Sequence, residues 1–463
     1  MTPAEHLGLD LLVTLDRDGG RPLREQLEGQ LRDGIRRGVL HAGTPLPSTR
    51  ALAAELTVSR GVVVEAYAQL VAEGFLVARA GAATRVATVA RHEPAEPPVE
   101  RIPPPVRFDL RVEAADLAAF PRRAWCNALR DTLREAPDAA LGYGDRAGAP
   151  VLRSVLAAYV GRARGVAAEP ENVVVSTGIT QAIAVLARVL HRAGVTRVGI
   201  EDPGFPIHRR IFAVEGLRPV PLPVDAGGLI VEGLAAADVG AVLVTPSHQF
   251  PLGMAMAPER RAELVEWAAT QDTWIFEDDY DGEYRFDRDP VGALQALAPA
   301  RVVYLGSASK TLAPSLRLGW MVVPPGLIDE VVDAKMLADA GTPQIEQLAL
   351  ARFIEQGELD RHLRRMRVSY RRRRDALVAG LDEHLPQLEQ EGIAAGLHIS
   401  TRLPPELPFG PLLARAWESG VGLYGFEHGG IARVLLGYAN LPEPSVAPAV
   451  RALAELVAEV GAG

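Results

Sequence analysis

The stretch RVVYLGSASKTLAPSLRLGW, residues 301–320, places a lysine shortly after an apolar run. The run at 301–307 predicts a buried strand, because β-branched and aromatic residues follow one another until polar residues end it. Lys310 is one of two lysines in the chain, the other being Lys335, and every other basic side chain except histidine is arginine. A lysine in a protected site can lose its proton and attack an aldehyde, whereas arginine stays protonated. The position therefore indicates Schiff-base chemistry at Lys310.

Four further apolar runs precede this one and are separated by stretches with helical patterning. Each run ends in polar residues, and in open α/β sheets ligands bind at the carboxyl ends of the strands. The sequence therefore predicts an α/β body with its chemistry gathered at one edge of the sheet. The four runs lie at 173–176, 197–202, 241–246 and 273–278.

The polar residues at these strand ends include groups that suit a flat, phosphorylated ring. Asp278 can pair with a pyridinium nitrogen and keep it charged. Ser307 and Arg317, with backbone amides at the start of the helix after the first strand, can bind a phosphate, and Phe205 can stack on a ring. Taken alone, the EDDYD run at 277–281 could also be a metal site or a solvated acidic turn. Combined with the lysine, these groups predict a site for pyridoxal 5′-phosphate.

The N-terminal part of the chain has the pattern of a small helical unit. Leucine or isoleucine recurs at every fourth position over 23–35, which predicts a helix with one apolar face. Ser48 and Ser59 stand where they would cap two further helices. Two short strands around Gly81 would form a wing. The buried stripe of the third helix is predicted to comprise Val63, Tyr67, Leu70 and Val71.

Two helices joined by a short turn and followed by a hairpin describe a winged helix-turn-helix. Residues 21–85 contain nine arginines and six acidic residues, so this unit is mildly basic in a chain of net charge −9. Arginines at helix starts can reach phosphates or base edges of double-stranded DNA. The alternative is a helical interaction module with ordinary surface arginines. The candidate DNA-binding residues are Ser48, Arg50, Ser59 and Arg60.

Composition and length set the organisation of the chain. A length of 463 residues suggests more than one domain. We expect a winged helix-turn-helix over 10–88, a proline-rich linker over 89–107 and an effector domain over 108–463. One cysteine, Cys126, excludes an internal disulfide. The N-terminus lacks a signal peptide and no apolar run is long enough for a membrane helix, so we expect a soluble cytoplasmic protein.

The small unit resembles the GntR-type DNA-binding domain over its whole length. The resemblance is carried by P-S-x-R at 47–50, S-R at 59–60 and A-Y-x-x-L-x-x-E-G at 66–74. The wing departs from the family, because it reads GAATRV at 81–86 where the family usually has G-S-G-T-x-V. The resemblance implies operator binding through the helices and leaves the wing contact open.

The body resembles fold-type I aminotransferases and, more narrowly, the MocR/GabR group of regulators, which fuse a GntR-type domain to an aminotransferase-like body. Residues 245–320, EDPGFP at 201–206 and YGDRAGAP at 143–150 carry this resemblance. It implies a mainly parallel central sheet with helices on both faces, a smaller C-terminal α/β subdomain and a homodimer. By the same resemblance, Lys310 forms the internal aldimine with pyridoxal 5′-phosphate, and Asp278 and Tyr280 contact the ring nitrogen and ring hydroxyl. The remaining cofactor contacts would be Ser307, Arg317, Phe205, Gly178 and Ile179.

Two positions depart from the aminotransferase pattern. Phe250 stands where these enzymes usually have an asparagine that contacts the ring hydroxyl, and His248 or Gln249 would contribute instead. Leu435 stands where many of them have an arginine that clamps a substrate carboxylate. Arg433 would point to the same strand face and could replace it, although a surface arginine is an equally good interpretation. The candidate effector-binding residues are Arg433, Tyr143 and His248.

Three functions fit these observations to different degrees. The favoured one is a transcription regulator that senses pyridoxal phosphate, an amine or an amino acid, with at most a residual half-transamination and no metal. The alternative is an active aminotransferase with an appended DNA-binding-like domain, which Phe250 disfavours. A DNA-binding protein with a dead body is disfavoured by the retained Lys310. Lys335 is expected on the surface of a helix.

Overall fold

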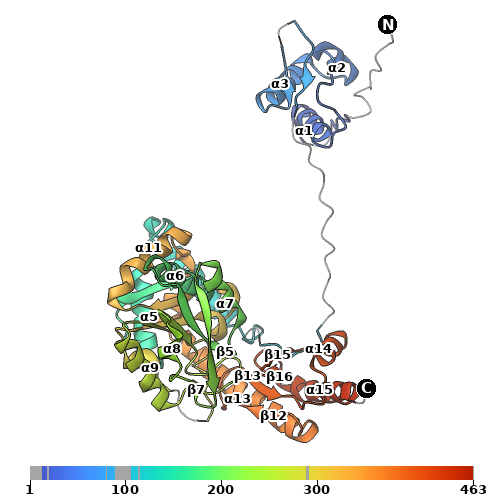
Figure 1. Ribbon diagram of the computed structural model, residues 1–463. Helices are drawn as coiled ribbons and strands as arrows, with labels where there is room; N and C mark the ends of the chain where they lie inside the picture. Colours follow the sequence, from blue (N-terminus) through green and yellow to red (C-terminus); the bar gives the residue numbers. More distant parts are fainter. Residues whose placement is uncertain are drawn as a thin grey trace. The chain divides into compact units, whose positions relative to one another are not determined.

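The computed structural model describes residues 13–17, 20–79, 81–88, 106–112, 115–287 and 291–461. The chain divides into two compact units between Ile102 and Pro103 (Figure 1). Most of the linker predicted at 89–107 lies outside the described residues. None of the described helices is both long and apolar enough to cross a membrane.

The N-terminal unit is a three-helix winged helix-turn-helix. Its helices are α1 (Leu23–Arg36), α2 (Thr49–Glu55) and α3 (Arg60–Ala72), and its wing pairs β1 (Leu76–Val77) with β2 (Arg85–Val86) in antiparallel register. The core consists mainly of leucines, with other apolar side chains, and all three helices contribute to it, which confirms the predicted periodicity.

The predicted N-caps of α2 and α3 and the predicted buried face of α3 agree only in part with the structure. The Ser48 side chain accepts a hydrogen bond from the Ala51 amide at 3.2 Å and so caps α2 as predicted. Ser59 occupies the N-cap position of α3, but its side chain makes no capping bond. The prediction that Val71 is buried was wrong, because 36% of it is exposed while Ala66 is fully buried. Positions 63, 66 and 70 lie on one helical face, and position 71 lies beside it.

The body is built on an eight-stranded sheet in the order β4-β11-β10-β9-β8-β5-β6-β7. The strands from β10 to β6 are parallel, as expected, while β11 runs antiparallel to both of its neighbours and β7 antiparallel to β6. The bounds are β4 Val173–Ser176, β5 Arg197–Asp202, β6 Arg218–Asp225, β7 Gly228–Leu229, β8 Ala241–Val244, β9 Trp274–Asp278, β10 Val302–Ser307 and β11 Gly319–Val322.

Alternating residues of the large sheet pack into separate clusters on its two faces. Val173 and Val175 join the cluster that contains α5 (Pro150–Arg164) and α12 (Gln344–Glu355), whereas Val174 joins the cluster that contains α6 (Ile179–Arg192) and α11 (Ile328–Asp339). A strand buried on both faces reads as a continuous apolar run, which is why the sequence revealed these strands. The remaining helices of this part are α4 Arg122–Glu135, α7 Pro206–Val214, α8 Leu234–Ala237, α9 Pro258–Thr270 and α10 Ala308–Thr311.

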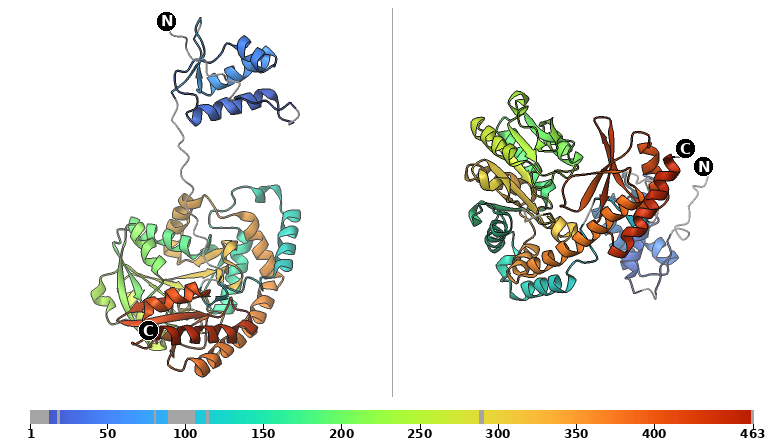
Figure 2. Two further views of the ribbon diagram at one scale, coloured as in Figure 1. Left: turned by 90° about the vertical axis from the view of Figure 1, so that its right-hand side faces the viewer. Right: turned by 90° about the horizontal axis from the view of Figure 1, so that it is seen from below.

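A smaller antiparallel sheet forms the C-terminal subdomain (Figure 2), in the order β12-β13-β16-β15. Leu377 of α13 and Val450 of α15 belong to the same buried cluster as Val434 of this sheet. A separate parallel pair joins β3 (Phe108–Asp109), which follows the linker, to β14 (Val421–Gly422). The other bounds are α13 Glu358–His384, β12 Glu389–Glu391, β13 His398–Arg402, α14 Phe409–Glu418, β15 Tyr424–His428, β16 Ile431–Gly437 and α15 Val446–Gly461.

Candidate functional site

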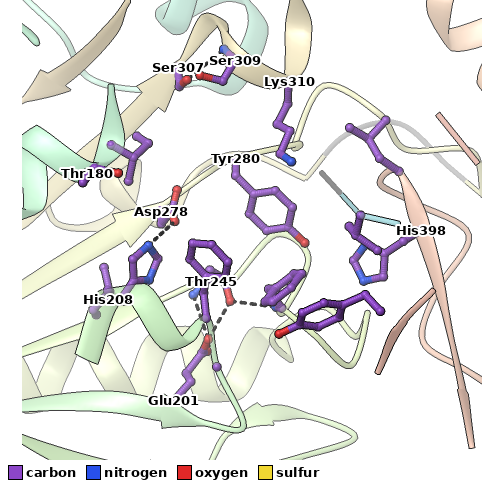
Figure 3. Close-up of a pocket in the computed structure, with 18 of the residues that line it drawn as sticks. Thr180, Glu201, His208, Thr245, Asp278, Tyr280, Ser307, Ser309, Lys310 and His398 are labelled. Atoms are coloured by element: carbon purple, nitrogen blue, oxygen red, sulfur yellow. Dashed lines mark hydrogen bonds and ion pairs between the residues drawn. The ribbon is translucent and has the colours of Figure 1, made fainter. Parts of the chain in front are cut away.

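A cavity of about 450 Å³ lies at the carboxyl ends of β5, β8, β9 and β10. Residues at or near the small sheet complete its lining, so the cavity has a large-sheet wall and a small-sheet wall. Figure 3 shows Lys310 and Tyr280 in the middle of the site, with Asp278 on one side and His398 on the other. The lining also includes Ile179, Thr180, Glu201, Phe205, His208, Thr245, Phe250, Ser307, Ser309, Arg317, Arg111 and Tyr424.

Asp278, at the end of β9, presents an unsatisfied carboxylate to this cavity. Its Oδ1 atom is buried and has no hydrogen-bond partner among the described residues, and its Oδ2 atom lies 3.6 Å from Nε2 of His208. Burial, together with the charges of Asp279, Asp281 and Glu201, raises the pKa of Asp278 to about 7. Burial lowers the pKa of His208 to about 4, so this imidazole is neutral at neutral pH. The neutral His208 therefore supplies no cation at this carboxyl, and the charge of Lys310 offsets the effect of burial only in part.

The acidic run around Asp278 is buried, so it is not a solvated turn. Glu277 accepts the backbone amides of Leu294 and Gln295 at 2.7 and 2.8 Å. Asp279 forms a two-point salt bridge with the buried Arg164, at 2.6 and 3.0 Å. Because each of these two acids has a structural partner, Asp278 is the member of the strand that is available to a ligand.

Tyr280, His248 and Asp281 form a hydrogen-bonded group beside the cavity, and His398 lies next to it. The Tyr280 hydroxyl lies 3.0 Å from Nδ1 of His248, and the same nitrogen lies 2.9 Å from Oδ2 of Asp281. Ligand atoms of His248, Asp281 and His398 lie within 4.8 Å of one another, a spacing that a metal could bridge. The Nδ1 contacts to two oxygens favour a hydrogen-bonded relay that fixes the Tyr280 hydroxyl. Burial and the neighbouring His248 lower the pKa of His398 to about 3.

The start of α6 and the loop before β11 form the other end of the cavity. Gly178 has φ +110°, and a Cβ atom there would lie 3.0 Å from Nη2 of Arg317. Ser307 caps α10 by accepting the Ser309 amide at 2.9 Å. The Thr177 amide already donates to the side chain of Gln181 at 2.8 Å, so the available helix amides begin after it. Backbone amides, hydroxyls and a guanidinium thus converge as an anion site requires.

Lys310 sits in the short helix α10 and is half-buried in the cavity lining. It lies close enough to Asp278 and His398 for its charge to lower the pKa of each. The ring of Phe205 is 42% exposed and meets Phe250 edge to face, with centroids 5.5 Å apart. The aromatic wall therefore combines the predicted stacking residue with the phenylalanine that departs from the aminotransferase pattern.

The comparisons with known proteins agree with both units. Residues 23–86 match the bacterial regulatory proteins of the gntR family, and residues 113–406 match aminotransferase class I and II. The probable rhizopine catabolism regulatory protein MocR of Rhizobium meliloti is 37% identical over 399 residues, covering 81% of this chain and 80% of that protein. The chain belongs to the MocR-type regulators. As a member it is an HTH-type transcriptional regulator, so the regulator is confirmed over the enzyme alternative.

Two further likenesses bear on this MocR-type regulator. The pyridoxine biosynthesis regulator PdxR of Corynebacterium glutamicum is 34% identical over 396 residues, covering 84% of this chain and 85% of PdxR. The α-aminoadipate aminotransferase LysN of Thermus thermophilus, complexed with N-(5′-phosphopyridoxyl)-L-leucine, is 26% identical with a TM-score of 0.69. It is matched over 77% of this chain and 93% of LysN. The body therefore has the fold of an aminotransferase whose structure holds a pyridoxal phosphate derivative.

The structure brings most of the predicted cofactor residues of the regulator together. Phe205, Asp278, Tyr280, Ser307, Lys310, Arg317 and Ile179 line the cavity. Gly178 lies next to the guanidinium group of Arg317, since a Cβ atom at this glycine would be 3.0 Å from Nη2. The predicted DNA-binding residues Ser48, Arg50, Ser59 and Arg60 are all exposed at or just before the helix starts.

The three candidate effector residues lie outside the cavity lining. Arg433 forms a two-point salt bridge with Glu391, at 2.6 and 3.1 Å. Tyr143 is 86% exposed. His248 contacts the lining residues Tyr280, through a 3.0 Å hydrogen bond, and His398, with ring centroids 5.2 Å apart. Gln249 donates to the backbone carbonyls of Pro203 and Phe250, so it supports the loop.

The expectation that Lys335 lies on the surface of its helix was wrong. It is fully buried, and its Nζ atom pairs with Asp339 at 3.1 and 3.2 Å. The Asp339 carboxylate also accepts from Gln181, which holds the Thr177 amide at the start of α6. This lysine is therefore a structural cation that is held by a carboxylate.

Sequence reasoning missed several lining residues of the regulator. Glu201 is buried, accepts the Thr245 hydroxyl at 2.6 Å, and leaves its Oε1 atom without a hydrogen-bond partner in the described part of the chain. Its position at the end of β5 was a usable signal, whereas His208 lies within α7 and His398 begins β13. Arg111 could not be found, because its place in the cavity depends on the pairing of β3 with β14.

Proposed function

We propose that this regulator holds pyridoxal 5′-phosphate in the cavity through Lys310 and that an effector acting at the cofactor changes operator affinity. One observation carries the proposal. The unpartnered Oδ1 atom of Asp278 faces the same cavity as Lys310, and burial, which Lys310 offsets only in part, raises the pKa of Asp278. A protonated ring nitrogen would supply a hydrogen-bond donor and a positive charge to this oxygen.

The other lining residues fit the remaining parts of the cofactor. When bound, the cofactor supplies an aldehyde that a lysine amine can attach to and a ring that withdraws electrons. Arg317, Ser307 and the first amides of α6 would hold its phosphate. Tyr280, fixed by His248, would face the ring hydroxyl, and Phe205 would contact the ring plane.

The effector is proposed to be an amine, an amino acid or the cofactor itself. PdxR is named for pyridoxine biosynthesis, which supports the cofactor as one signal. MocR is named for rhizopine catabolism, which supports a small molecule of another kind. Ligand control requires only different affinities for two conformations of the regulator, not turnover.

Operator contacts are proposed for the exposed residues at the helix starts of the N-terminal unit. Arg50 and Arg60 form no ion pair or hydrogen bond within the described part of the chain, so their guanidinium groups can contact DNA phosphates or bases. A homodimer would read two half-sites, as symmetric regulators do. Such a protein acts with its DNA in the cytoplasm.

The test combines cofactor absorbance with operator binding. Purified full-length protein is loaded with pyridoxal 5′-phosphate and titrated with amines and amino acids, while the visible absorbance and the affinity for operator DNA are followed. We expect a change in operator affinity of about 5- to 150-fold, the usual range of allosteric coupling, with negligible multiple turnover. Sustained turnover at about 1 per second or more, with no ligand effect on DNA, would contradict the proposal and favour an aminotransferase.

A further inference from the structure

Three arginine or lysine side chains line the cavity in the described part of the chain, and the proposed function uses two of them. Lys310 and Arg317 come from the large-sheet wall, where they would hold the cofactor. The third, Arg111, comes from the small-sheet wall. We propose that Arg111 binds the carboxylate of the effector, so that the effector is an amino acid rather than a simple amine. This inference rests on the proposed function, because the amine of the same molecule would react at the cofactor.

The backbone around Arg111 is fixed tightly against the small sheet. Strand β3 ends at Asp109 and pairs with β14, and the carbonyl of Leu110 accepts the amide of Gly437 at 2.7 Å. A Cβ atom at Gly437 would lie only 2.5 Å from the carbonyl oxygen of Arg111, so a larger residue there would displace this segment. The arginine is therefore presented from a defined position and not from a loose loop.

The guanidinium group is already arranged around a carboxylate. Its Nε atom donates to Oδ1 of Asp109 at 2.7 Å, and its Nη2 atom donates to Oδ2 at 3.0 Å. A Cβ atom at Gly422 would lie 3.1 Å from both the Arg111 Nε and the Asp109 Oδ1, so glycine leaves room for the pair. The side chains are 29% and 26% exposed, which leaves the pair open to replacement. A ligand carboxylate has the same two-oxygen geometry as Asp109 and can replace it or share the guanidinium.

None of three other residues at or near this wall can bind a ligand carboxylate. His398 lines the cavity, but its lowered pKa keeps it neutral. Arg433 is bound to Glu391 and does not line the cavity. Leu435, which stands where many aminotransferases have an arginine, is a fully buried apolar side chain and offers no charge. Arg111 is thus the remaining positive group on the small-sheet wall, among the residues that the structure describes.

The position of Arg111 also offers a route by which effector binding could influence the DNA-binding unit. Strand β3 is the first strand after the linker, and Asp109 helps to hold it by accepting from Asn440 at 3.3 Å. A carboxylate that replaces Asp109 on Arg111 changes the contacts of this strand. The signal would therefore enter the segment that is joined covalently to the linker.

The test compares acids with amines that differ only by the carboxylate. Cofactor-loaded full-length protein is mixed with β-alanine or L-alanine against ethylamine, and with γ-aminobutyrate against propylamine, and the half-saturating concentration for the change in visible absorbance is measured. After correction for the fraction of free amine, we expect the wild type to prefer at least one acid by about 10- to 100-fold, as a charged two-point contact would give. Arg111→Gln should remove this preference and leave the response to the plain amines unchanged.

Two further variants separate the guanidinium from the fold around it. Arg433→Gln removes the competing arginine and should keep the preference, and Asp109→Asn breaks the pair without removing the cation and should also keep it. The proposal is overturned if the wild type shows no preference, if Arg111→Gln retains it, or if either control loses as much as Arg111→Gln. Absence of a cofactor band in the wild type would instead show that the proposed function itself is wrong.

Discussion

The two units of this regulator present their candidate functional groups in opposite ways. In the N-terminal unit, Arg50 and Arg60 are exposed, and their charges cost the folded state little free energy because water stabilises them. In the body, Asp278 and Glu201 are buried at strand ends, and burial raises the pKa of each to about 7. Each carboxyl has one oxygen without a hydrogen-bond partner among the described residues, and such buried atoms destabilise a fold unless a ligand compensates them. The difference indicates that the body is completed by a bound group, whereas the N-terminal unit is complete before it meets DNA.

The largest effect is expected at the cavity lysine. Lys310→Ala should abolish the covalent link to pyridoxal phosphate, because the other lysine is buried in a salt bridge with Asp339. Borohydride reduction followed by mass measurement should detect one attached cofactor per chain in the wild type and none in the variant.

Lys335→Met is the matched control for this prediction. It removes the second lysine and leaves Asp339 without its cation, so the free energy of unfolding should fall. At saturating cofactor the borohydride-stable link should remain. A link that survived in Lys310→Ala and vanished in Lys335→Met would exchange the roles of the two lysines.

A second large effect, of opposite sign with and without cofactor, is expected for Asp278→Asn. With cofactor, loss of the carboxylate should weaken binding by two orders of magnitude or more, since a charged hydrogen-bonded pair contributes roughly 3 kcal/mol. Without cofactor, the variant should be more stable than the wild type at pH 8. The reason is that the buried charge of the carboxylate is removed while its shape is kept.

The pH dependence of this second effect follows from the raised pKa. Burial raises the pKa of Asp278 to about 7 in the folded protein, against an ordinary value of 3.8. The folded state therefore binds the proton more tightly, and Asp278 lowers stability as the pH rises from about 4 to about 7. Denaturant unfolding of the cofactor-free proteins should show equal stability near pH 4 and a gap of a few kcal/mol at pH 8. A gap that is the same at both pH values would contradict this account.

A smaller effect is expected at the exposed arginines. Arg50→Ala and Arg60→Ala should each weaken operator binding by about 1–3 kcal/mol at particular base pairs, or flatten the salt dependence by about one unit if the lost contact is to a phosphate. The cofactor absorbance should not change. Arg37→Ala removes an exposed arginine at the C-terminal end of α1 and serves as the control. Unchanged operator binding in both test variants would remove these arginines from the DNA interface.

The contrast between the two units also explains what the sequence could reveal. Apolar periodicity predicted α1 to α3 and the strands of the large sheet, because burial on one or both faces leaves a regular pattern. Lys310 and Asp278 were predicted as site residues because each stands at or just after the end of a strand, and Arg317 because of its spacing from Lys310. Strand ends gather at one edge of a parallel sheet whatever the details of packing.

The remaining site residues depend on tertiary pairing. Arg111 reaches the cavity only because β3 adds to β14, which is more than 300 residues away along the chain. Arg433 appeared suitable as a clamp from its strand position, yet Glu391 of β12 binds it. Strand alternation predicts the face of the sheet on which a side chain lies, but it does not predict which residue the side chain contacts there.

The smallest expected effect separates two serines that the sequence treats alike. Ser48 caps α2 through the Ala51 amide, whereas the Ser59 side chain makes no capping bond at α3. Ser48→Ala should therefore lower the stability of the N-terminal unit by about 1 kcal/mol. In a unit of this size that corresponds to a fall in melting temperature of about 4–8 °C. Ser59→Ala should leave the melting temperature of the unit nearly unchanged.

Measuring the operator affinity of both variants adds a second comparison of the two serines. Both are exposed at helix starts, where hydroxyls can contact phosphates. If both variants lose affinity well below their melting temperatures, both hydroxyls contact DNA, and only Ser48 has a second role in folding. If Ser59→Ala melts as early as Ser48→Ala, the capping distinction is wrong. If Ser59→Ala changes neither property, its hydroxyl plays no part in the interface, and the contacts of α3 begin with Arg60.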